Sequence, residues 1–94
     1  MSCAAFGAGE KTVLFTARHH ACESTGNYVL EGVLEHLLSL PEIPFRCVVV
    51  PFVDFDGVVD GDQGKGRLPR DHNRDYIDAP LYPETAAIMR LVRE

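Results

Sequence analysis

The stretch KTVLFTARHHACES, residues 11 to 24, decides the fold, because an apolar run in it passes directly into a polar segment. Residues 11–17 are rich in β-forming side chains and lack polar alternation, which predicts a strand covered on both faces. Ser24 or Thr25 is placed to cap a following helix. A strand that leads into a helix in this way predicts the opening of a βαβ unit.

The rest of the chain continues the alternation of strand and helix. Apolar residues recur at helical spacing over residues 28–40, and two prolines shortly afterwards end that helix. Residues 45–55 (FRCVVVPFVDF) form a second β-rich run, in which Pro51 predicts a bulge or an unpaired edge. Residues 82–94 carry an apolar stripe that predicts a further helix. The order predicts an α/β fold with a right-handed βαβ unit plus a helix.

The composition limits the class of protein. The chain has 94 residues, of which 46% are hydrophobic and 24% charged, so we expect one globular domain. Three cysteines favour reduced thiols in a cytoplasm. The net charge of -5 disfavours a nucleic-acid partner, and no apolar run approaches the roughly 20 residues that span a membrane.

The expected elements do not cover their own sheet. Two parallel strands present two apolar faces and two open edges, which one or two helices leave partly uncovered. A helix after a βαβ unit normally returns to another strand. We therefore expect residues 1–94 to form the front part of a larger α/β domain, or a subunit completed by another chain.

Polar residues follow both expected strands. Residues 18–24 follow the first run, and residues 54–76 follow the second. The carboxyl ends of parallel strands lie at one edge of a sheet, where α/β folds bind their ligands. The segment of residues 56–80 is also longer than most loops in compact domains, and such length is typical of a functional loop. We expect the two segments to converge in space.

His20 and Glu23 form an H-x-x-E pair in the first polar segment. A catalytic zinc ion takes His and Glu among its protein ligands and keeps one position open. A spacing of three residues in a turn that enters a helix can aim both side chains at one point. His19 is a competing ligand, because strand alternation cannot choose between neighbours at a strand end. In the alternative interpretation, Glu23 stabilises the helix dipole and His20 is a surface residue.

Cys22 permits a different kind of site. A thiol near a helix N-terminus, beside histidines, can act as a nucleophile. The sequence favours the simpler interpretation, in which Cys22 is a small buried residue that packs under the loop.

The second polar segment contains Arg67, Arg70 and Arg74, and Asn73 precedes the last of them. A guanidinium group binds a carboxylate in a planar fork, and a neighbouring Asn adds a donor. The alternative is a set of exposed arginines paired with Asp60, Asp62, Asp71 and Asp75. The stretch DGDQG, residues 60–64, lacks the later oxygen ligands of an EF-hand, so we do not expect calcium.

Together, RHHACE, VDFDGVVDGDQGKGR and HNRDY resemble the zinc metallocarboxypeptidase family, which includes carboxypeptidase A and the cytosolic carboxypeptidases. That family has H-x-x-E after one strand. An Asn-Pro-Asp-Gly-like turn, an arginine and an Asn-Arg pair follow the next strand. The resemblance covers roughly residues 11 to 78 and keeps the family's order. It implies a three-layer α/β/α fold with a mixed sheet, of which residues 1–94 would be the front part.

The resemblance implies zinc-dependent removal of C-terminal residues from peptides. His20 and Glu23 would be the first two ligands of Zn²⁺, which activates water and polarises a carbonyl. Arg67 would polarise the scissile carbonyl, and Arg70 competes with it for that role.

The resemblance also implies how a substrate is held. Asn73 and Arg74 would bind the terminal carboxylate of a peptide, with Arg70 close enough to contribute. The free carboxylate is then the feature by which a substrate is recognised.

This chain departs from the family's pattern in ways that matter for activity. The sequence DFDG, residues 54–57, replaces the Asn-Pro-Asp-Gly-like turn. The family's third zinc ligand is a later histidine and its general base a later glutamate, and neither has a match after Arg74. We therefore expect the isolated chain to carry part of an active site, to bind zinc weakly and to be inactive alone.

Three other functions remain open at this stage. Aspartoacylase-like and succinylglutamate desuccinylase-like zinc amidohydrolases share H-x-x-E and an Asn-Arg pair, and they act on N-acyl amino acids. A non-catalytic module would use the arginines to bind carboxylates or peptide C-termini. An oligomerising scaffold would use neither the H-x-x-E pair nor the arginines. For each zinc enzyme we expect a cytoplasmic protein without nucleic-acid or membrane partners, and a complementing chain or oligomer remains open.

Overall fold

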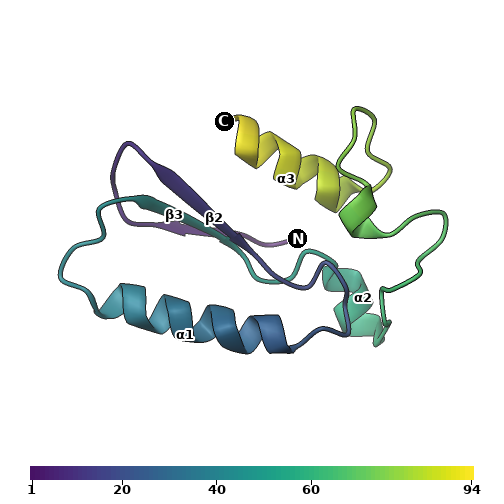
Figure 1. Ribbon diagram of the computed structural model, residues 1–94, viewed down its shortest axis with the longest axis horizontal. Coiled ribbons are helices and arrows are strands. Elements are labelled where there is room, and N and C mark those ends of the chain that lie inside the picture. The colour runs from purple at the N-terminus through teal and green to yellow at the C-terminus, as the bar shows by residue number, and fades with distance from the viewer.

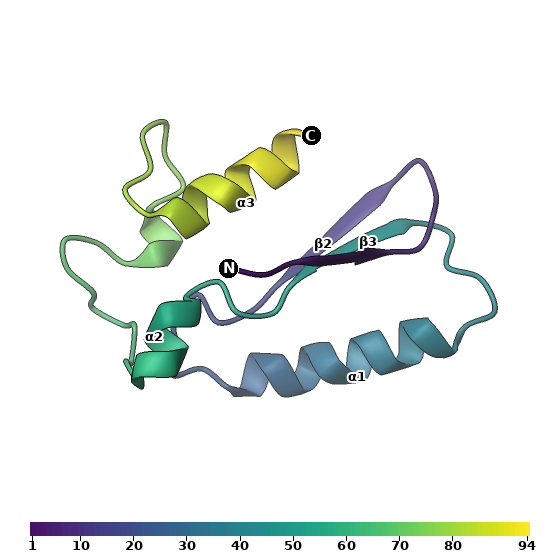
Figure 2. The same cartoon turned by 180° about the vertical axis from the view of Figure 1, so that it is seen from behind.

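The computed structural model describes residues 1–94 as a small α/β domain with a three-stranded mixed sheet and three helices (Figure 1). Figure 2 shows the same arrangement from behind. In chain order the elements are β1 (Ala4–Phe6), β2 (Thr12–Thr16), α1 (Thr25–Ser39), β3 (Arg46–Val50), α2 (Phe55–Asp60), the short 3-10 helix η1 (His72–Arg74) and α3 (Pro83–Arg93). None of these helices combines the length and apolarity needed to traverse a lipid bilayer.

β3 is the central strand of the sheet, with β1 on one side and β2 on the other. β2 and β3 run parallel, with Leu14 opposite Val48, and α1 connects them. The α/β fold with a βαβ unit and a mixed sheet is therefore confirmed. β1 pairs antiparallel with β3 and makes the sheet mixed. Sequence reasoning missed β1, because a strand of three residues is too short to show a period.

β2 does not lie in the environment predicted for it. The sequence predicts a strand covered on both faces, but Thr12, Val13 and Thr16 are exposed. β2 is an edge strand, and edge strands are less covered than central ones. β3 is the strand that is covered on both faces, because it is buried from Cys47 to Val50.

α1 and α3 lie on opposite faces of the sheet (Figure 1). From α1, Leu30 packs against Cys47 and Val49 of β3. From α3, Ile88 packs against Val50. Side chains alternate between the faces of a strand, so adjacent residues of β3 supply two separate apolar clusters. The chain thus has three layers, with each helix fixed to the sheet by its own cluster.

The second β-rich run is shorter than predicted. β3 ends at Val50, so Pro51 lies beyond the strand rather than at a bulge within it. The chain then forms α2, where the sequence predicts a loop. The Asp54 side chain accepts a hydrogen bond of 3.1 Å from the Gly57 N–H, and Gly61 ends the helix with a φ of 77°. An aspartate N-cap and a left-handed glycine C-cap are sequence signals for such a helix.

The molecule is flat and exposes much surface for its mass. Its extents are 45 × 28 × 16 Å, and its radius of gyration is 14.2 Å, against about 12 Å for a compact domain of this length. Its accessible surface is 6268 Å², against about 5,400 Å² for a compact monomer of this mass. The sheet edges and parts of its faces therefore remain open, as the strand count predicts.

One buried carboxylate fixes the start of α3. Asp75 has no exposed surface, and its oxygens accept hydrogen bonds of 2.9 Å from the backbone N–H groups of Leu81 and Tyr82. Arg70 Nη1 lies 3.4 Å from the same carboxylate. Burial acts to raise the pKa of Asp75, but the amide hydrogen bonds and the Arg70 charge outweigh it and hold the pKa below its ordinary value.

We predict that Ile88→Ala lowers the free energy of unfolding by about 2–4 kcal/mol, because it removes buried methyl groups and leaves a cavity under α3. Val92→Ala on the same helix is the matched control, because Val92 is 69% exposed. We expect that variant to change stability by less than about 0.5 kcal/mol. Urea denaturation followed by circular dichroism measures both. Equal effects of the two substitutions would contradict the packing of α3 described above.

We predict that Asp75→Asn lowers stability at neutral pH and makes stability less dependent on pH in acid. The folded-state pKa of Asp75 lies below the ordinary value of 3.8, so the unfolded chain takes up a proton first. The stabilisation is therefore present above about pH 4 and is lost as the pH falls further. The measurement is the urea midpoint at a series of pH values, with Asp78→Asn on the exposed surface as the control. Parallel pH profiles for wild type and Asp75→Asn would refute the assignment.

Candidate functional site

The loops after β2 and β3 lie against each other. The Cys22 N–H donates a hydrogen bond of 3.1 Å to the Gln63 carbonyl. Gly64 approaches so closely that a Cβ atom there would lie 2.7 Å from the Ala21 nitrogen. Its φ of +83° also favours glycine. The convergence expected from the parallel strands is confirmed.

Backbone hydrogen bonds to the segment after β3 and a side-chain contact of Arg18 hold the first loop in place. The N–H groups of Val53 and Asp54 donate hydrogen bonds to the carbonyls of Ala17 and Arg18, which ties the end of β2 to the segment after β3. Arg18 has a φ of 60°, and its Nη1 donates a hydrogen bond of 2.6 Å to the Ala21 carbonyl. This left-handed residue turns the chain so that the following side chains face the second loop.

His20 is the centre of the candidate site. Its Nε2 lies 2.6 Å from Asp71 Oδ2 and 3.3 Å from Asn73 Nδ2. Its Nδ1 lies 3.3 Å from Glu23 Oε1. The two ring nitrogens therefore face different partners, with Asp71 on one side and Glu23 on the other. The predicted H-x-x-E pair converges, and Asn73 of the second loop reaches it.

The charges around His20 favour its protonated form. Burial acts to lower the pKa of His20, but the hydrogen bonds to Asp71 and Glu23 outweigh it and raise the pKa above its ordinary value. Burial acts in the opposite direction on Asp71. There the Asn73 N–H and His20 hold the pKa below its ordinary value, with a contribution from the charge of Arg74. The His20 ring lies between the two carboxylates, which accommodates an imidazolium.

Glu23 has a second cationic neighbour. Lys65 Nζ lies 3.0 Å from Glu23 Oε1, and both side chains are exposed. The hydrogen bonds from Lys65 and His20 lower the pKa of the Glu23 carboxyl. Glu23 is therefore an ionised carboxylate at the surface of the site, which is the form that binds a metal.

Asn73 and Arg74 lie in η1, next to Asp71. The Asp71 carboxylate caps this turn by accepting a hydrogen bond of 2.8 Å from the Asn73 N–H. Arg74 is exposed and forms no salt bridge. Its positive charge nevertheless contributes to the lowered pKa of Asp71, which places it in the field of the same cluster. An exposed guanidinium beside this cluster is available to an anionic ligand.

The other two arginines are held by carboxylates. Arg67 Nη2 lies 2.7 Å from the buried Asp54 and 3.4 Å from Asp62. Arg70 Nη1 lies 3.4 Å from Asp75. This agrees in part with the alternative in which aspartates pair with the arginines: Asp62 and Asp75 were expected partners, whereas Asp54 was not, and both arginines are half-buried rather than exposed. Lys65 and Arg67 nevertheless both line a shallow hollow of about 260 Å³ at the surface of the second loop.

His19 and Cys22 do not join the His20 cluster. His19 Nε2 lies 2.5 Å from the Tyr76 hydroxyl, and burial, followed by the charges of His72 and His20, lowers its pKa. The structure thus gives His19 a partner other than Glu23. Cys22 is exposed, so the interpretation of Cys22 as a small buried residue is wrong. Its N–H points into the contact with the second loop, which leaves the side chain outside.

The donor set fits part of a metal site. His20 Nδ1 and Glu23 offer a nitrogen and an oxygen at one point, and a carboxylate on the other ring nitrogen is a typical outer partner of a metal-bound histidine. No group of three or more His, Cys, Asp or Glu side chains is arranged to hold a metal ion. His20 and Glu23 therefore lie together as the sequence predicts, and their role as metal ligands stays a prediction.

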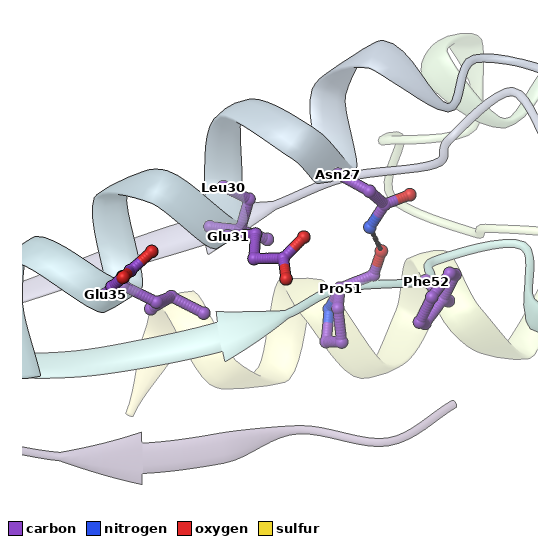
Figure 3. Close-up of a pocket in the computed structure, with 7 residues that line it drawn as sticks. Asn27, Leu30, Glu31, Glu35, Pro51 and Phe52 are labelled. Atoms are coloured by element: carbon purple, nitrogen blue, oxygen red, sulfur yellow. Dashed lines mark hydrogen bonds between the residues drawn. The ribbon is translucent and has the colours of Figure 1, made fainter.

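The largest hollow lies away from this cluster. A groove of about 630 Å³ runs between α1 and the segment after β3 (Figure 3). Leu30 and Phe52 contribute apolar surface, and Glu31 and Glu35 project from α1. Asn27 crosses one end and donates a hydrogen bond of 2.7 Å to the Pro51 carbonyl. The groove contains no histidine, cysteine or cation, so its chemistry does not compete with that of the His20 cluster.

Sequence reasoning missed two members of the site. Asp71 appears in the sequence as one of several counterions for arginines, whereas the structure places it on His20. A usable signal was the need of a metal-binding histidine for a carboxylate on its second nitrogen. Lys65 had no signal, because its contact with Glu23 depends on how the second loop folds back.

Comparison with known proteins gives one consistent group of relatives. The chain is 38% identical over 73 residues to cytosolic carboxypeptidase 2 of Danio rerio, which covers 71% of this chain and 10% of that protein. It is 37% identical over 76 residues to human cytosolic carboxypeptidase 2, covering 73% of this chain and 8% of that protein. Human cytosolic carboxypeptidase 6 is 27% identical over 96 residues, covering 92% of this chain and 19% of that protein.

The similarity covers only a small part of each relative. The chain spans about a tenth of the length of the first of these relatives. No protein-family model matches it, and no solved structure matches it. Over about three quarters of its length, the chain is homologous to a short part of the cytosolic carboxypeptidases.

Proposed function

We propose that this chain carries part of the active site of a zinc-dependent metallocarboxypeptidase-like hydrolase, which removes C-terminal residues from peptides. The observation that carries the proposal is the environment of His20. Asp71 engages Nε2, while Nδ1 faces the Glu23 carboxylate. A histidine with a carboxylate on one nitrogen is fixed in the tautomer that directs the other nitrogen at a metal.

The roles of the residues follow from this arrangement. His20 Nδ1 and Glu23 would hold Zn²⁺, and Asp71 would orient the imidazole ring. When bound, zinc supplies the Lewis acidity that activates water and polarises a carbonyl. His20 must release its proton before it can bind the ion, so binding weakens as the pH falls.

The second loop would bind the substrate. Of the arginines in this loop, Arg74 is the one that is exposed and has no carboxylate partner, and Asn73 lies beside His20, so the two could hold a terminal carboxylate. Arg67 and Arg70 remain the candidates for polarising the carbonyl. Each would have to share its guanidinium with the aspartate that now holds it.

The relatives support this choice of reaction and location. Their name assigns them to carboxypeptidases and to the cytosol, and we propose both for this protein. Hydrolysis of N-acyl amino acids would use the same carboxylate contacts and is the runner-up. We further propose that a third zinc ligand and a general base come from residues outside 1–94, because no third His, Cys, Asp or Glu completes a metal site here.

We predict that the chain binds one equivalent of Zn²⁺ weakly, and that His20→Ala abolishes this binding. Asp71→Asn should weaken it by about 10- to 100-fold, because the outer carboxylate no longer fixes the imidazole. Isothermal titration calorimetry measures the affinity, and Co²⁺ absorption reports the ligand field. His36→Ala is the control, because His36 lies exposed on α1.

The outcome separates the candidate functions. Weak zinc binding that requires His20 supports a partial hydrolase site. Tight, stoichiometric zinc without turnover would favour a non-catalytic module. Zinc binding that survives His20→Ala would rule out the proposed site.

We predict that N-acetyl-glycyl-phenylalanine binds beside the zinc site and that Arg74→Ala weakens it by about tenfold or more, because a charge-assisted carboxylate contact is lost. NMR titration of the labelled chain measures the affinity. Arg93→Ala, at the exposed end of α3, is the matched arginine control. The C-terminal amide of the same ligand should bind no better to wild type than to Arg74→Ala. Tighter binding of N-acetyl-phenylalanine than of the dipeptide would favour the N-acyl amino acid reaction.

A further inference from the structure

The residues that face His20 alternate with a residue that faces the opposite way. Asp71 and Asn73 both contact His20. His72 lies between them and is 2% exposed. Its ring stacks on Tyr82 with a centroid separation of 4.2 Å and an interplanar angle of 25°. The short helix η1 thus presents one side to the site and its other side to the start of α3.

Further contacts fasten the same segment to α3. The Tyr82 hydroxyl donates a hydrogen bond of 2.7 Å to the Arg70 carbonyl, just before the segment. The Asp75 carboxylate accepts the N–H groups of Leu81 and Tyr82, just after it. Residues 71–74 are therefore held at both ends, and His72 is the attachment in the middle.

His72 fastens this segment through its stack on Tyr82 and not through a side-chain hydrogen bond. Its Nδ1 is buried without a partner, and its Nε2 lies 3.9 Å from the nearest Glu84 oxygen, which exceeds hydrogen-bond distance. A buried nitrogen without a partner costs free energy. An aromatic ring without nitrogens should therefore serve at this position as well as histidine does.

We infer that His72 is a positioning residue: its stack on Tyr82 holds Asp71 and Asn73–Arg74 in place together, so that one anchor serves both the metal and the carboxylate contacts. This inference rests on the proposed function. Groups that are held before a ligand arrives do not have to be ordered when it binds. Loss of the stack should therefore weaken both ligands at once.

The test compares two substitutions at His72 in the 94-residue chain. His72→Leu fills the position with an apolar side chain that cannot stack, whereas His72→Phe retains an aromatic ring. We expect His72→Leu to weaken Zn²⁺ and N-acetyl-glycyl-phenylalanine by roughly three- to tenfold each, which corresponds to the contribution of an aromatic pair. His72→Phe should stay within about twofold of wild type for both ligands. ¹⁵N heteronuclear NOE values of Asn73 and Arg74 should fall in His72→Leu only.

Leu30→Ala separates positioning from general loss of stability. Leu30 lies in the cluster between α1 and the sheet, away from η1, so this variant should be less stable but keep both affinities. All affinities are measured at a temperature where circular dichroism shows each variant folded. If His72→Leu does not fold, Tyr82→Leu removes the same stack from its other side, together with the hydrogen bond to the Arg70 carbonyl. Tyr82→Phe, which keeps the ring and loses only that hydrogen bond, is then the control and should stay within about twofold of wild type for both ligands, and a loss of affinity in Tyr82→Phe equal to that in Tyr82→Leu would overturn the inference.

The possible failures can be told apart. If wild type binds neither ligand, the proposed function fails and this inference fails with it. If wild type binds both ligands and His72→Leu keeps them within about twofold, or loses only one, the inference alone is overturned. The inference is also overturned if His72→Phe loses as much affinity as His72→Leu.

Discussion

The contact between His20 and Asp71 joins two loops that lie 51 residues apart in sequence, at a distance of 2.6 Å. It depends on the parallel pairing of β2 and β3, because that pairing brings both strand ends to one edge of the sheet. It also fixes the orientation of the imidazole, which leaves Nδ1 for Glu23. If β2 slipped along β3, His20 and Asp71 would no longer meet, and the cluster would be lost.

The aspartates of the second loop divide its arginines into two kinds. Asp54 and Asp75 are buried, and each holds one guanidinium close to the protein. Arg74 has no such partner and stays exposed beside Asp71. Removing Arg67 or Arg70 would leave a buried carboxylate without its cation, which is destabilising, so both arginines are needed to keep the loop in shape. The loop can therefore keep its shape while one cation remains available for a ligand.

The open sheet and the partial ligand set are consistent with each other. The exposed Val13 on the edge strand, the flat shape and the large accessible surface all indicate that the chain buries less than a compact domain does. Likewise, no group of three or more His, Cys, Asp or Glu side chains is arranged to hold a metal ion, whereas a catalytic zinc takes three protein ligands. Both properties agree with homology to a short part of much longer cytosolic carboxypeptidases.

The sequence by itself determined the order of β2, α1, β3 and α3, because their apolar runs and proline stops are local signals. It also indicated that a histidine could meet Glu23 within one turn, but it could not choose between His19 and His20, and the structure places His20 there. Tertiary structure decided the rest. β1 forms a strand only through its pairing with β3. That pairing makes β3 the central strand and leaves β2 at an edge. Asp71 met His20, and Asp54 met Arg67, only after the second loop had folded back, because contacts between distant residues depend on sheet register and loop path rather than on local pattern.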